Sequence, residues 1–366
     1  MMKSTNFDTR TFFFYLFIFL SFVAEYKILN SSVISYVIAI FLICYDYNKI
    51  ELNKLQIIVL LFFLIYIILS LIYSVDLLIT LKNIKYWLGS IVIYLYLSLN
   101  KNKLNYIYIF RIAYSIILVE SLLVNTIIDQ NLLYHTPHTA SFFNFYNRPP
   151  SFAGIASVTG TGLVLLYYYL HVYLNKLRYF DYIFFLISLV LLFSTTAFAI
   201  FGIATLGIMI FKKKSYSDYG LLFIAILLCM IFFLVLNYLE HQYLTDTFNF
   251  EKITVTYVLK ILHMTFGSWY NFYEIHDFSI NYLIGRQVNG TLETAGDNGF
   301  VILIEQMGIL GLLIFFSFIV IYTKNKKYYF LTLFLIILGN FHYFAFGNIM
   351  CLIFIIQLMM HHEIKE

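Results

Sequence analysis

Residues 55–74 read LQIIVLLFFLIYIILSLIYS, and this stretch decides the fold class of the chain. It is about as long as an α-helix must be to cross the hydrocarbon core of a bilayer, which takes roughly 20 residues. It contains no charged side chain. We therefore predict that it forms a helix that spans a membrane.

The composition of the whole chain agrees with this prediction. Of the 366 residues, 62% are hydrophobic and only 11% are charged, and the mean hydropathy is +0.85. Soluble domains are nearer to about half apolar and about a quarter charged. Such a small polar surface cannot cover a globule in water, so lipid is expected to be the solvent. The Lys and Arg residues sit in short clusters between apolar runs, which excludes a nucleic-acid partner.

Apolar runs of similar length recur along the chain, and we predict about 12 transmembrane helices that form one all-α membrane domain, residues 1–366. Two long runs, 182–211 and 328–360, are ambiguous, because each is long for one span and short for two. A polar break inside each run favours two helices. The helices are expected at 11–27, 31–46, 55–74, 84–100, 105–128, 153–173, 181–195, 197–211, 219–239, 298–322, 328–341 and 346–361.

The distribution of Lys and Arg residues predicts the orientation. Twelve spans put both termini on one side, and sixteen of the 23 Lys and Arg residues then fall on that side. Arg111 is counted there because its long side chain can reach that face. Cytoplasmic loops are enriched in Lys and Arg, so both termini are predicted to be cytoplasmic. If either long run formed a single span, the Lys212–Lys214 or the Lys324–Lys327 cluster would lie outside. The charge distribution therefore supports the division of both runs into two helices.

The first of two prominent external segments is predicted at residues 129–152. It contains all three prolines of the chain, and two of them directly follow Arg148, as Arg148-Pro149-Pro150. A proline fixes its own φ and restricts the residue before it. A guanidinium held on such a backbone suits bidentate phosphate binding. The alternative is that Arg148 only anchors the loop to lipid headgroups.

The second external segment is predicted at residues 240–297. Within it, polar residues recur at spacings of four, four and three, and apolar residues fall on another face, which predicts an amphipathic helix on the membrane surface. The polar positions are Lys252, Thr256, Lys260 and His263, and the apolar positions are Val255, Leu259, Leu262 and Phe266. A cluster containing His276 and Asp277 follows, then Arg286, and the segment ends at Asp297.

Several residues near and inside the predicted spans are candidates for chemistry. Asp297 stands where a helix N-cap belongs, so capping is the alternative to catalysis there. Glu120 and Glu305 lie within apolar runs, where an acid is costly and is usually paired or functional. Gly308 and Gly311 are expected to let a neighbouring helix approach closely.

Metal and cofactor sites are not predicted. The three cysteines, Cys44, Cys229 and Cys351, all fall inside apolar runs and have neither disulfide nor zinc spacing. His276 and Asp277 lack a metal-ligand spacing, and the chain contains neither a glycine-rich phosphate loop nor a hydrolase serine motif.

The two external segments together resemble those of the O-antigen polymerases (Wzy-type) and the related O-antigen ligases of bacterial surface-polysaccharide assembly. The sequence Arg-x-x-Ser-Phe-x-Gly, from Arg148 to Gly154, leads into a helix. Later, Asp297-Asn298-Gly299-Phe300 precedes a helix that contains Glu305 and two glycines. The ligases usually carry a histidine where this chain has Asp297, which favours the polymerase branch.

The resemblance implies a GT-C-like, metal-independent membrane glycosyltransferase of the bacterial cytoplasmic (inner) membrane, without a cofactor. Its substrates would be a donor and an acceptor glycan on undecaprenyl pyrophosphate, and a chain-length regulator protein is a candidate partner. Arg148 matches the arginine of the family's first loop, and Arg286 lies close to its glycine turn. Where ligases carry an arginine early in the large loop, this chain has Lys260 and His263, which we assign to substrate binding together with His276, Asp277 and Glu305.

The predicted reaction is the attack of a sugar hydroxyl on an anomeric carbon, with the lipid pyrophosphate leaving. Arg148 and Arg286 would stabilise the developing negative charge. Asp297 would accept the hydroxyl proton, with His276 or Asp277 as reserves. The alternatives are an O-antigen ligase, a polysaccharide flippase and a non-catalytic membrane partner.

Overall fold

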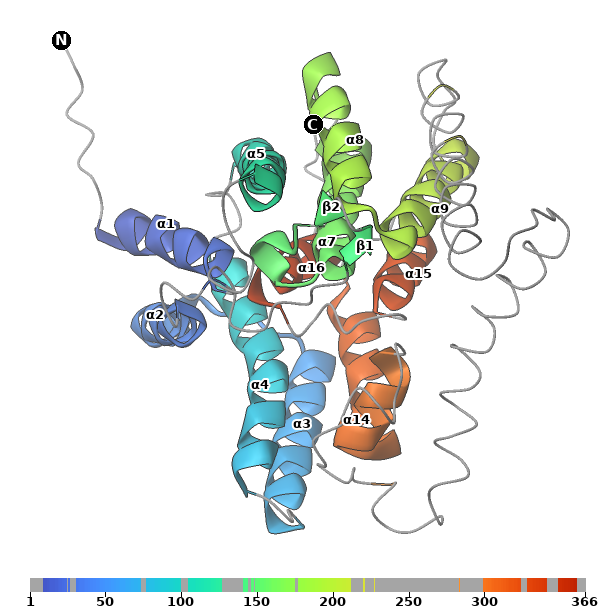
Figure 1. Ribbon diagram of the computed structural model, residues 1–366. Helices are drawn as coiled ribbons and strands as arrows, with labels where there is room; N and C mark the ends of the chain where they lie inside the picture. The colour runs from blue at the N-terminus through green and yellow to red at the C-terminus, as the bar shows by residue number, and fades with distance from the viewer. Residues whose placement is uncertain are drawn as a thin grey trace, which may run out of the picture. The chain divides into compact units, whose positions relative to one another are not determined.

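Helices form nearly all of the chain that the structure describes (Figure 1). Within the described residues, the strands are limited to a short antiparallel hairpin in which β1 (Ser141–Phe143) pairs with β2 (Tyr146–Asn147). The all-α class is therefore confirmed for this part of the chain. The computed structural model describes residues 9–24, 26, 31–73, 77–99, 105–126, 141–143, 146–147, 149–174, 177–211, 220, 227, 283, 299–323, 328–340 and 348–360.

The α-helices agree with eleven of the twelve predicted runs to within a few residues at most ends, and the twelfth, 219–239, lies almost wholly outside the described residues. They are α1 (Thr9–Phe22), α2 (Ser31–Tyr45), α3 (Lys54–Ile72), α4 (Leu77–Leu99), α5 (Tyr106–Thr126), α7 (Ala156–Tyr169), α8 (Tyr179–Leu192), α9 (Thr195–Phe211), α14 (Gly299–Tyr322), α15 (Tyr329–Gly339) and α16 (Ile349–Met360). Short helical turns add η1 (Tyr47–Lys49), η2 (Ser151–Ala153) and η3 (Leu170–Leu174), a π-helical turn that continues α7.

One helix start was predicted wrongly, at α4. This helix begins at Leu77, seven residues before the expected start at residue 84, so that Lys82 and Lys85 fall inside it. The prediction placed the boundary at these charges. A lysine does not end a helix, however, because its straight side chain loses little rotamer freedom there.

Both long apolar runs are divided into two helices, as predicted. Between α8 and α9 the chain turns at Phe193, a non-glycine residue in the left-handed region with φ 46°. In the second run, α15 ends at Gly339 and α16 begins at Ile349. The polar breaks seen in the sequence therefore mark real helix ends.

The helices of the chain belong to two compact units. The first unit contains α1, α2, α5, α7, α8 and α16, and the second contains α3, α9, α14 and α15, while the residues of α4 are shared between the two. The prediction of one domain over residues 1–366 stays a prediction.

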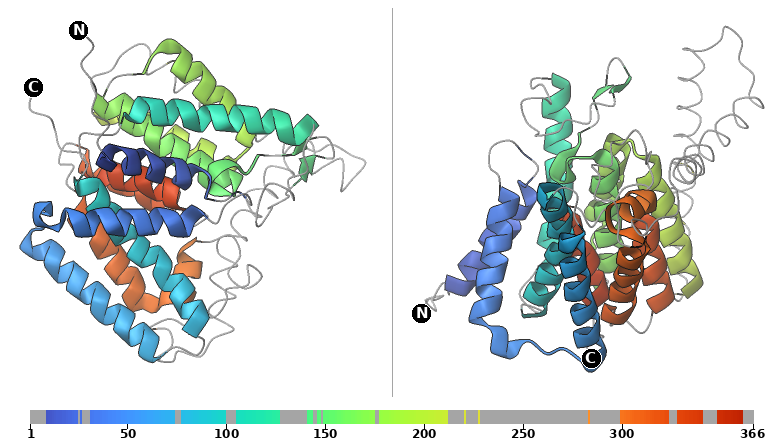
Figure 2. Two further views of the ribbon diagram at one scale, coloured as in Figure 1. Left: turned by 90° about the vertical axis from the view of Figure 1, so that its left-hand side faces the viewer. Right: turned by 90° about the horizontal axis from the view of Figure 1, so that it is seen from below.

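The core of the first unit is formed by α7 and α16. Every residue of α16 is buried, and so is every residue of α7 except Ser157. A helix that is apolar on all sides is buried on all sides. Helices α1, α5 and α8 surround this pair, and Figures 1 and 2 show α16, in red, running beside α7, in green. The two central helices approach closely at Gly162, where an added Cβ would lie 2.6 Å from Cys351 Sγ.

In the second unit, α3 packs on α14 and α9 packs on α15. Helix α14 is broken at Gly308, whose φ of 65° and ψ of −176° are not helical. The Tyr66 hydroxyl of α3 donates a hydrogen bond of 2.8 Å to the Met307 carbonyl oxygen at this break. The backbone at Gly308 adopts a conformation that is essentially restricted to glycine, so the break itself requires a glycine there.

Gly311, by contrast, has the expected packing role. An added Cβ there would overlap Met307 Cβ and would lie 3.0 Å from the Tyr66 hydroxyl oxygen. The distance to Met307 Cβ is shorter than real Cβ atoms show. The contact with Tyr66 is a contact with α3. Helices α3 and α14 therefore meet closely at this level because residue 311 has no side chain.

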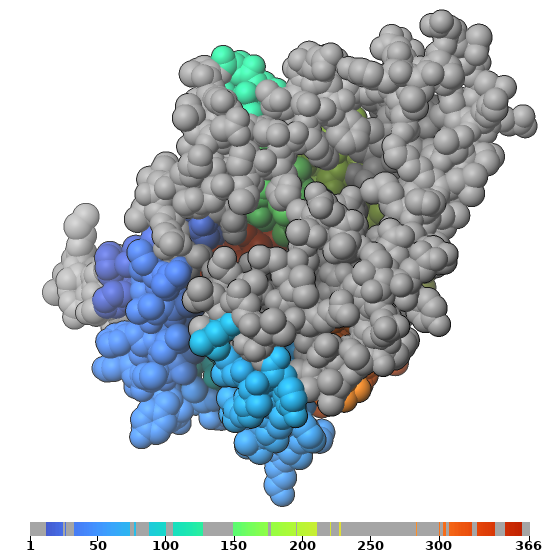
Figure 3. Space-filling view, turned by 60° about the horizontal axis from the view of Figure 1, so that its bottom comes forward, coloured from blue at the N-terminus to red at the C-terminus, as the bar shows by residue number. Residues whose placement is uncertain are grey.

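Two helices carry apolar residues on the exposed side and polar groups on the buried side. In α3 the buried residues include Gln56, Tyr66 and Ser70. The exposed residues of α3 after Lys54 are Leu55, Ile57, Ile58, Leu61, Phe62, Leu64, Ile65, Ile68 and Ile72. Figure 3 shows blue side chains of the N-terminal helices on the surface of the molecule. By length and composition, α3 and α5 can each span a membrane.

Helix α8 has the same arrangement as α3. Asp181 and Ser188 are buried in it, whereas its exposed large side chains are Tyr179, Phe180, Ile183, Phe184, Ile187 and Val190. In a helix of a soluble protein the apolar stripe faces the core and the polar face lies outside. In α3 and α8 the arrangement is reversed, because apolar side chains are exposed and polar side chains are buried.

Candidate functional site

Most of the predicted site residues lie outside the residues that the structure describes. Glu305 belongs to α14, three residues before the break at Gly308, and only its backbone is described. The other seven remain predictions, namely Arg148, Lys260, His263, His276, Asp277, Arg286 and Asp297.

The residues that directly follow Arg148 are described, and they form a buried turn, Pro149–Gly154. Pro149 and Pro150 are buried, and η2 begins at Ser151. Gly154 ends the turn with φ 72°, in the left-handed region that glycine adopts without strain. Helix α7 then starts at Ala156. The arginine of the first loop is therefore joined to a fixed, buried element.

Ser151 is the strained residue of the Pro149–Gly154 turn. Its φ is 58° although it carries a Cβ, and it is completely buried. The left-handed conformation costs a non-glycine residue roughly 1–2 kcal/mol. Such a conformation persists only where the surrounding structure determines it, so the contacts of this residue matter.

Glu120 of α5 makes the first of these contacts. Its side chain is buried, with 5% of the residue exposed, and its Oε1 accepts the Ser151 backbone N–H at 3.2 Å. A hydrogen bond contributes about 0.5–1.5 kcal/mol to stability. That contribution is comparable with the strain of the backbone at Ser151.

Tyr26, in the connection between α1 and α2, supplies the second donor to Glu120. Its hydroxyl donates to Glu120 Oε2 at 3.3 Å. A phenol is an O–H donor at neutral pH, so the two oxygens of Glu120 each accept one hydrogen bond, from Ser151 and from Tyr26.

Two further side chains hold the Pro149–Gly154 turn from other helices. Thr159 Oγ1 of α7 donates to the Pro150 carbonyl oxygen at 2.6 Å and accepts the Ala153 N–H at 3.3 Å. Asn348 Nδ2 donates to the Phe152 carbonyl oxygen at 3.3 Å. The Oδ1 of the same amide accepts N–H groups from the first turn of α16, so Asn348 ties that helix start to the turn.

Phe152 anchors the turn on its apolar side. It is fully buried, and its ring lies edge-to-face against Phe22 of α1 and Phe354 of α16, with centroid distances of 5.6 and 6.2 Å. Aromatic pairs of this geometry contribute about 0.5–1.5 kcal/mol beyond the area that they bury. Helices α1, α5, α7 and α16 thus all contact the segment that follows Arg148.

The sequence identified only part of this arrangement. Glu120 was recognised as a costly buried acid, and the double proline as a stiff segment. Asn348 was missed, although an Asn directly before an apolar run is a recognisable N-cap signal. Nothing in the sequence pattern connected Tyr26 or Thr159 to the turn, because these contacts depend on how the helices pack.

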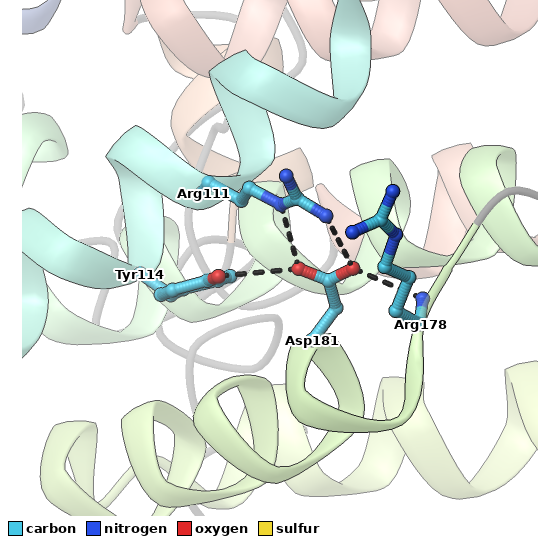
Figure 4. A network of polar contacts seen from close by, with 4 residues as sticks. All are labelled: Arg111, Tyr114, Arg178 and Asp181. Carbon is cyan, nitrogen blue, oxygen red and sulfur yellow. Dashed lines mark hydrogen bonds and ion pairs between the residues drawn. The ribbon is translucent and has the colours of Figure 1, made fainter.

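A second polar cluster joins the N-terminal part of α5 to the start of α8 (Figure 4). Arg111 donates to Asp181 through Nε at 2.9 Å and through Nη2 at 3.1 Å. The Tyr114 hydroxyl and the Arg178 backbone N–H also donate to this carboxylate. Asp181 is completely buried, and its four bonds make it a structural link between α5 and α8.

Comparison with protein-family models, with curated proteins and with solved structures finds no match for this chain. Its function is therefore inferred from its own residues, above all from the buried turn beside Arg148 and from the helices whose exposed sides are apolar.

Proposed function

We propose that this chain is a multi-pass protein of the bacterial cytoplasmic membrane that polymerises undecaprenyl-pyrophosphate-linked oligosaccharide repeat units into O-antigen or capsular polysaccharide. The observation that carries the proposal is the buried Pro149–Gly154 turn, which fixes the chain next to the arginine of the first loop. Arg148 directly precedes this turn in the sequence, and a guanidinium is suited to bidentate binding of a pyrophosphate.

The membrane environment is supported by the exposed faces of α3 and α8. Each places aliphatic and aromatic side chains where a soluble protein would place charges. Each buries polar groups that find hydrogen bonds inside the protein, such as Asp181 and Tyr66. Polar groups are expensive in hydrocarbon and therefore face the interior of a bundle. About 12 spans and a GT-C-like arrangement remain part of the proposal.

The proposed orientation places the two polar clusters of the first unit toward opposite faces of the membrane. Arg111 lies in the second turn of α5, and Glu120 lies near the end of the same helix. A rise of about 1.5 Å per residue separates them by roughly 14 Å along the helix axis. The Arg111–Asp181 pair would face the cytoplasm, and the Pro149–Gly154 turn would lie near the outer face.

The proposed reaction is a substitution at the anomeric carbon of the donor glycan. A hydroxyl oxygen of the acceptor forms the new C–O bond, and the bond from the anomeric carbon to the pyrophosphate oxygen breaks with its electron pair. Arg148 and Arg286 stabilise the negative charge that develops on the leaving group. Asp297 receives the proton of the attacking hydroxyl.

The experiment that tests the proposal is complementation of a deletion strain, with gel analysis of surface polysaccharide. We expect the deletion to leave single repeat units on the surface, and Arg148→Ala and Asp297→Ala to fail to restore the ladder of long chains. The matched control is Arg178→Ala, which removes an arginine side chain from the opposite predicted side and should restore the ladder.

Other outcomes identify the alternatives. A deletion that leaves no repeat units on the surface identifies a flippase, and one that leaves polymer only on undecaprenyl pyrophosphate identifies a ligase. A full ladder with Arg148→Ala at native expression removes that arginine from the mechanism.

A further inference from the structure

Arg178 carries an exposed guanidinium at the start of α8 that makes no contact needed for the fold. The residue is the N-cap of this helix. An arginine side chain has no acceptor for the N–H groups of a first turn, and the positive end of the helix dipole disfavours a cation there. Among the residues that the structure describes, none forms an ion pair with this guanidinium. Its positive charge is therefore available to a partner outside the chain.

The nearby carboxylate of Asp181 has no remaining capacity to bind the Arg178 side chain. Its Oδ1 accepts Arg111 Nε at 2.9 Å and the Tyr114 hydroxyl at 3.2 Å. Its Oδ2 accepts Arg111 Nη2 at 3.1 Å and the Arg178 backbone N–H at 3.0 Å. A carboxylate offers about four acceptor positions, so all of them are used. Two guanidiniums beside one carboxylate leave this cluster with a net positive charge.

The two guanidiniums of the cluster lie so that one anion can contact both. Figure 4 shows them on the same side of Asp181, with that of Arg178 turned toward that of Arg111. Arg111 is held in place by Asp181 and by the ring of Phe180, which lies 4.8 Å from its Cζ. Within the described part of the chain, Arg111 Nη1 has no hydrogen-bond partner. Paired guanidiniums with free N–H groups are suited to phosphate oxygens.

The surface around this cluster is typical of a membrane interface. Tyr108 of α5 and Tyr179 of α8 are exposed beside the arginines, and tyrosines are enriched where a span leaves the hydrocarbon. Further along the same two helices the exposed side chains are aliphatic, among them Ile112, Ile183 and Ile187. A phosphate at the arginines would thus continue into a surface that suits acyl chains.

We infer that Arg111 and Arg178 form a binding site for the phosphate of an anionic phospholipid, between the start of α8 and the N-terminal part of α5. Basic sites between transmembrane helices at the cytoplasmic face bind anionic lipid headgroups. A lipid fits better than a free anion, because the aliphatic surface adjoins the two cations. The inference rests on the membrane location and orientation of the proposed function, and is independent of its reaction.

The test measures lipid binding to the purified full chain in detergent. Phosphatidylglycerol, which is anionic, is compared with phosphatidylcholine of the same acyl chains, which is zwitterionic. Native mass spectrometry reports bound lipid, and the thermal unfolding midpoint reports the stabilisation that a bound ligand gives. We expect the parent protein to bind phosphatidylglycerol more tightly than phosphatidylcholine, and its midpoint to rise with phosphatidylglycerol alone.

Substitutions at position 178 assign the preference to this site. Arg178→Ala and Arg178→Gln should each lower the affinity for phosphatidylglycerol about fivefold or more, the usual contribution of one basic residue at an anionic surface. Arg178→Lys should keep most of it, because the charge remains. The matched control is Lys54→Ala, which removes an exposed cation from the start of α3 on the same predicted side and should change nothing. The midpoint of each variant without lipid reports whether it is folded.

Every result either supports or overturns the inference. An unchanged preference for phosphatidylglycerol in Arg178→Ala, or in Arg178→Gln where the alanine variant does not fold, shows that the lipid binds elsewhere. If inorganic phosphate raises the midpoint of the parent protein as much as phosphatidylglycerol does, the site binds a free anion and the lipid assignment is wrong. The proposed function is judged separately, by the polymer ladder of Arg148→Ala, so either proposal can fail without the other.

Discussion

At the scale of single residues, two buried acids of the first unit are stabilised in different ways. Asp181 has a cationic partner, because Arg111 binds it with two nitrogens. Glu120 has only neutral donors among the described residues. The four hydrogen bonds donated to Asp181 are explained by its role in joining α5 to α8.

The Arg111–Asp181 pair gives a prediction about stability. Asp181→Asn removes the charge that Arg111 faces, and only 26% of the Arg111 side chain is exposed to recover solvation. Breaking one partner of such a pair should cost about 3 kcal/mol. The thermal unfolding midpoint of the detergent-purified protein should fall clearly. Arg178→Ala, which keeps the backbone bond to Asp181, should change it little.

At the scale of elements, the contact between α7 and α16 depends on the absence of a side chain at Gly162. Two helices that are buried on all sides need close backbone approach, and small residues provide it. The Cys351 Sγ fills the space beside Gly162 and donates to the Val158 carbonyl oxygen at 3.3 Å. The fit at this point leaves no room for an additional methyl group.

We therefore predict that Gly162→Ala destabilises the protein by about 1–3 kcal/mol, the usual cost of overpacking a core. Adding Cys351→Ala removes the sulfur that the new methyl would meet, and should recover part of the loss. Gly202→Ala is the matched control, because nothing lies within 4 Å of the Cβ that it adds. It should be neutral or stabilise α9 by about 0.5–1 kcal/mol. If Gly162→Ala unfolds at the same temperature as the parent protein, the described packing of α7 on α16 is wrong.

The elements themselves could be predicted from the sequence, whereas the contacts among them could not. An apolar run of suitable length predicts a helix regardless of what lies beside it, and polar breaks such as Ser194-Thr195-Thr196 predict its ends. Tyr26 and Glu120 are 94 residues apart, and Asn348 and Phe152 are 196 apart. Polar bonds over such separations follow from helix packing, which no local pattern contains. The break at Gly308 was missed for the same reason, because a glycine near a helix contact usually indicates packing.

At the scale of the whole molecule, the proposal requires that the chain crosses the membrane between Cys44 and the first external loop an odd number of times. Cys44 is exposed near the end of α2, on the predicted cytoplasmic side, and Cys351 is buried. The natural cysteines therefore provide one accessible reporter and one internal reference for topology.

We predict that a membrane-impermeant maleimide labels Cys44 in inverted vesicles and not in intact spheroplasts, in a protein that carries Cys229→Ser. In a second protein with Cys44→Ser and Asn147→Cys, the labelling should be reversed. Cys351 should stay unlabelled in both until the protein is denatured. Labelling of Cys44 and of the cysteine at position 147 from the same side would exclude the proposed topology.

The exchanged faces of α3 have a practical consequence for handling the protein. The side chains that hold α3 in place, Gln56, Phe63 and Tyr66 among them, are separate from the nine large apolar ones on its exposed side. A designer could replace the latter with Glu, Lys and Gln and leave every described contact of this helix intact. On α8 the same change is open at Tyr179, Ile183, Ile187 and Val190, whereas Phe180 and Phe184 contact Arg111 and Tyr114 and would be kept. Such recoding should reduce the amount of surfactant needed to keep the purified protein dispersed.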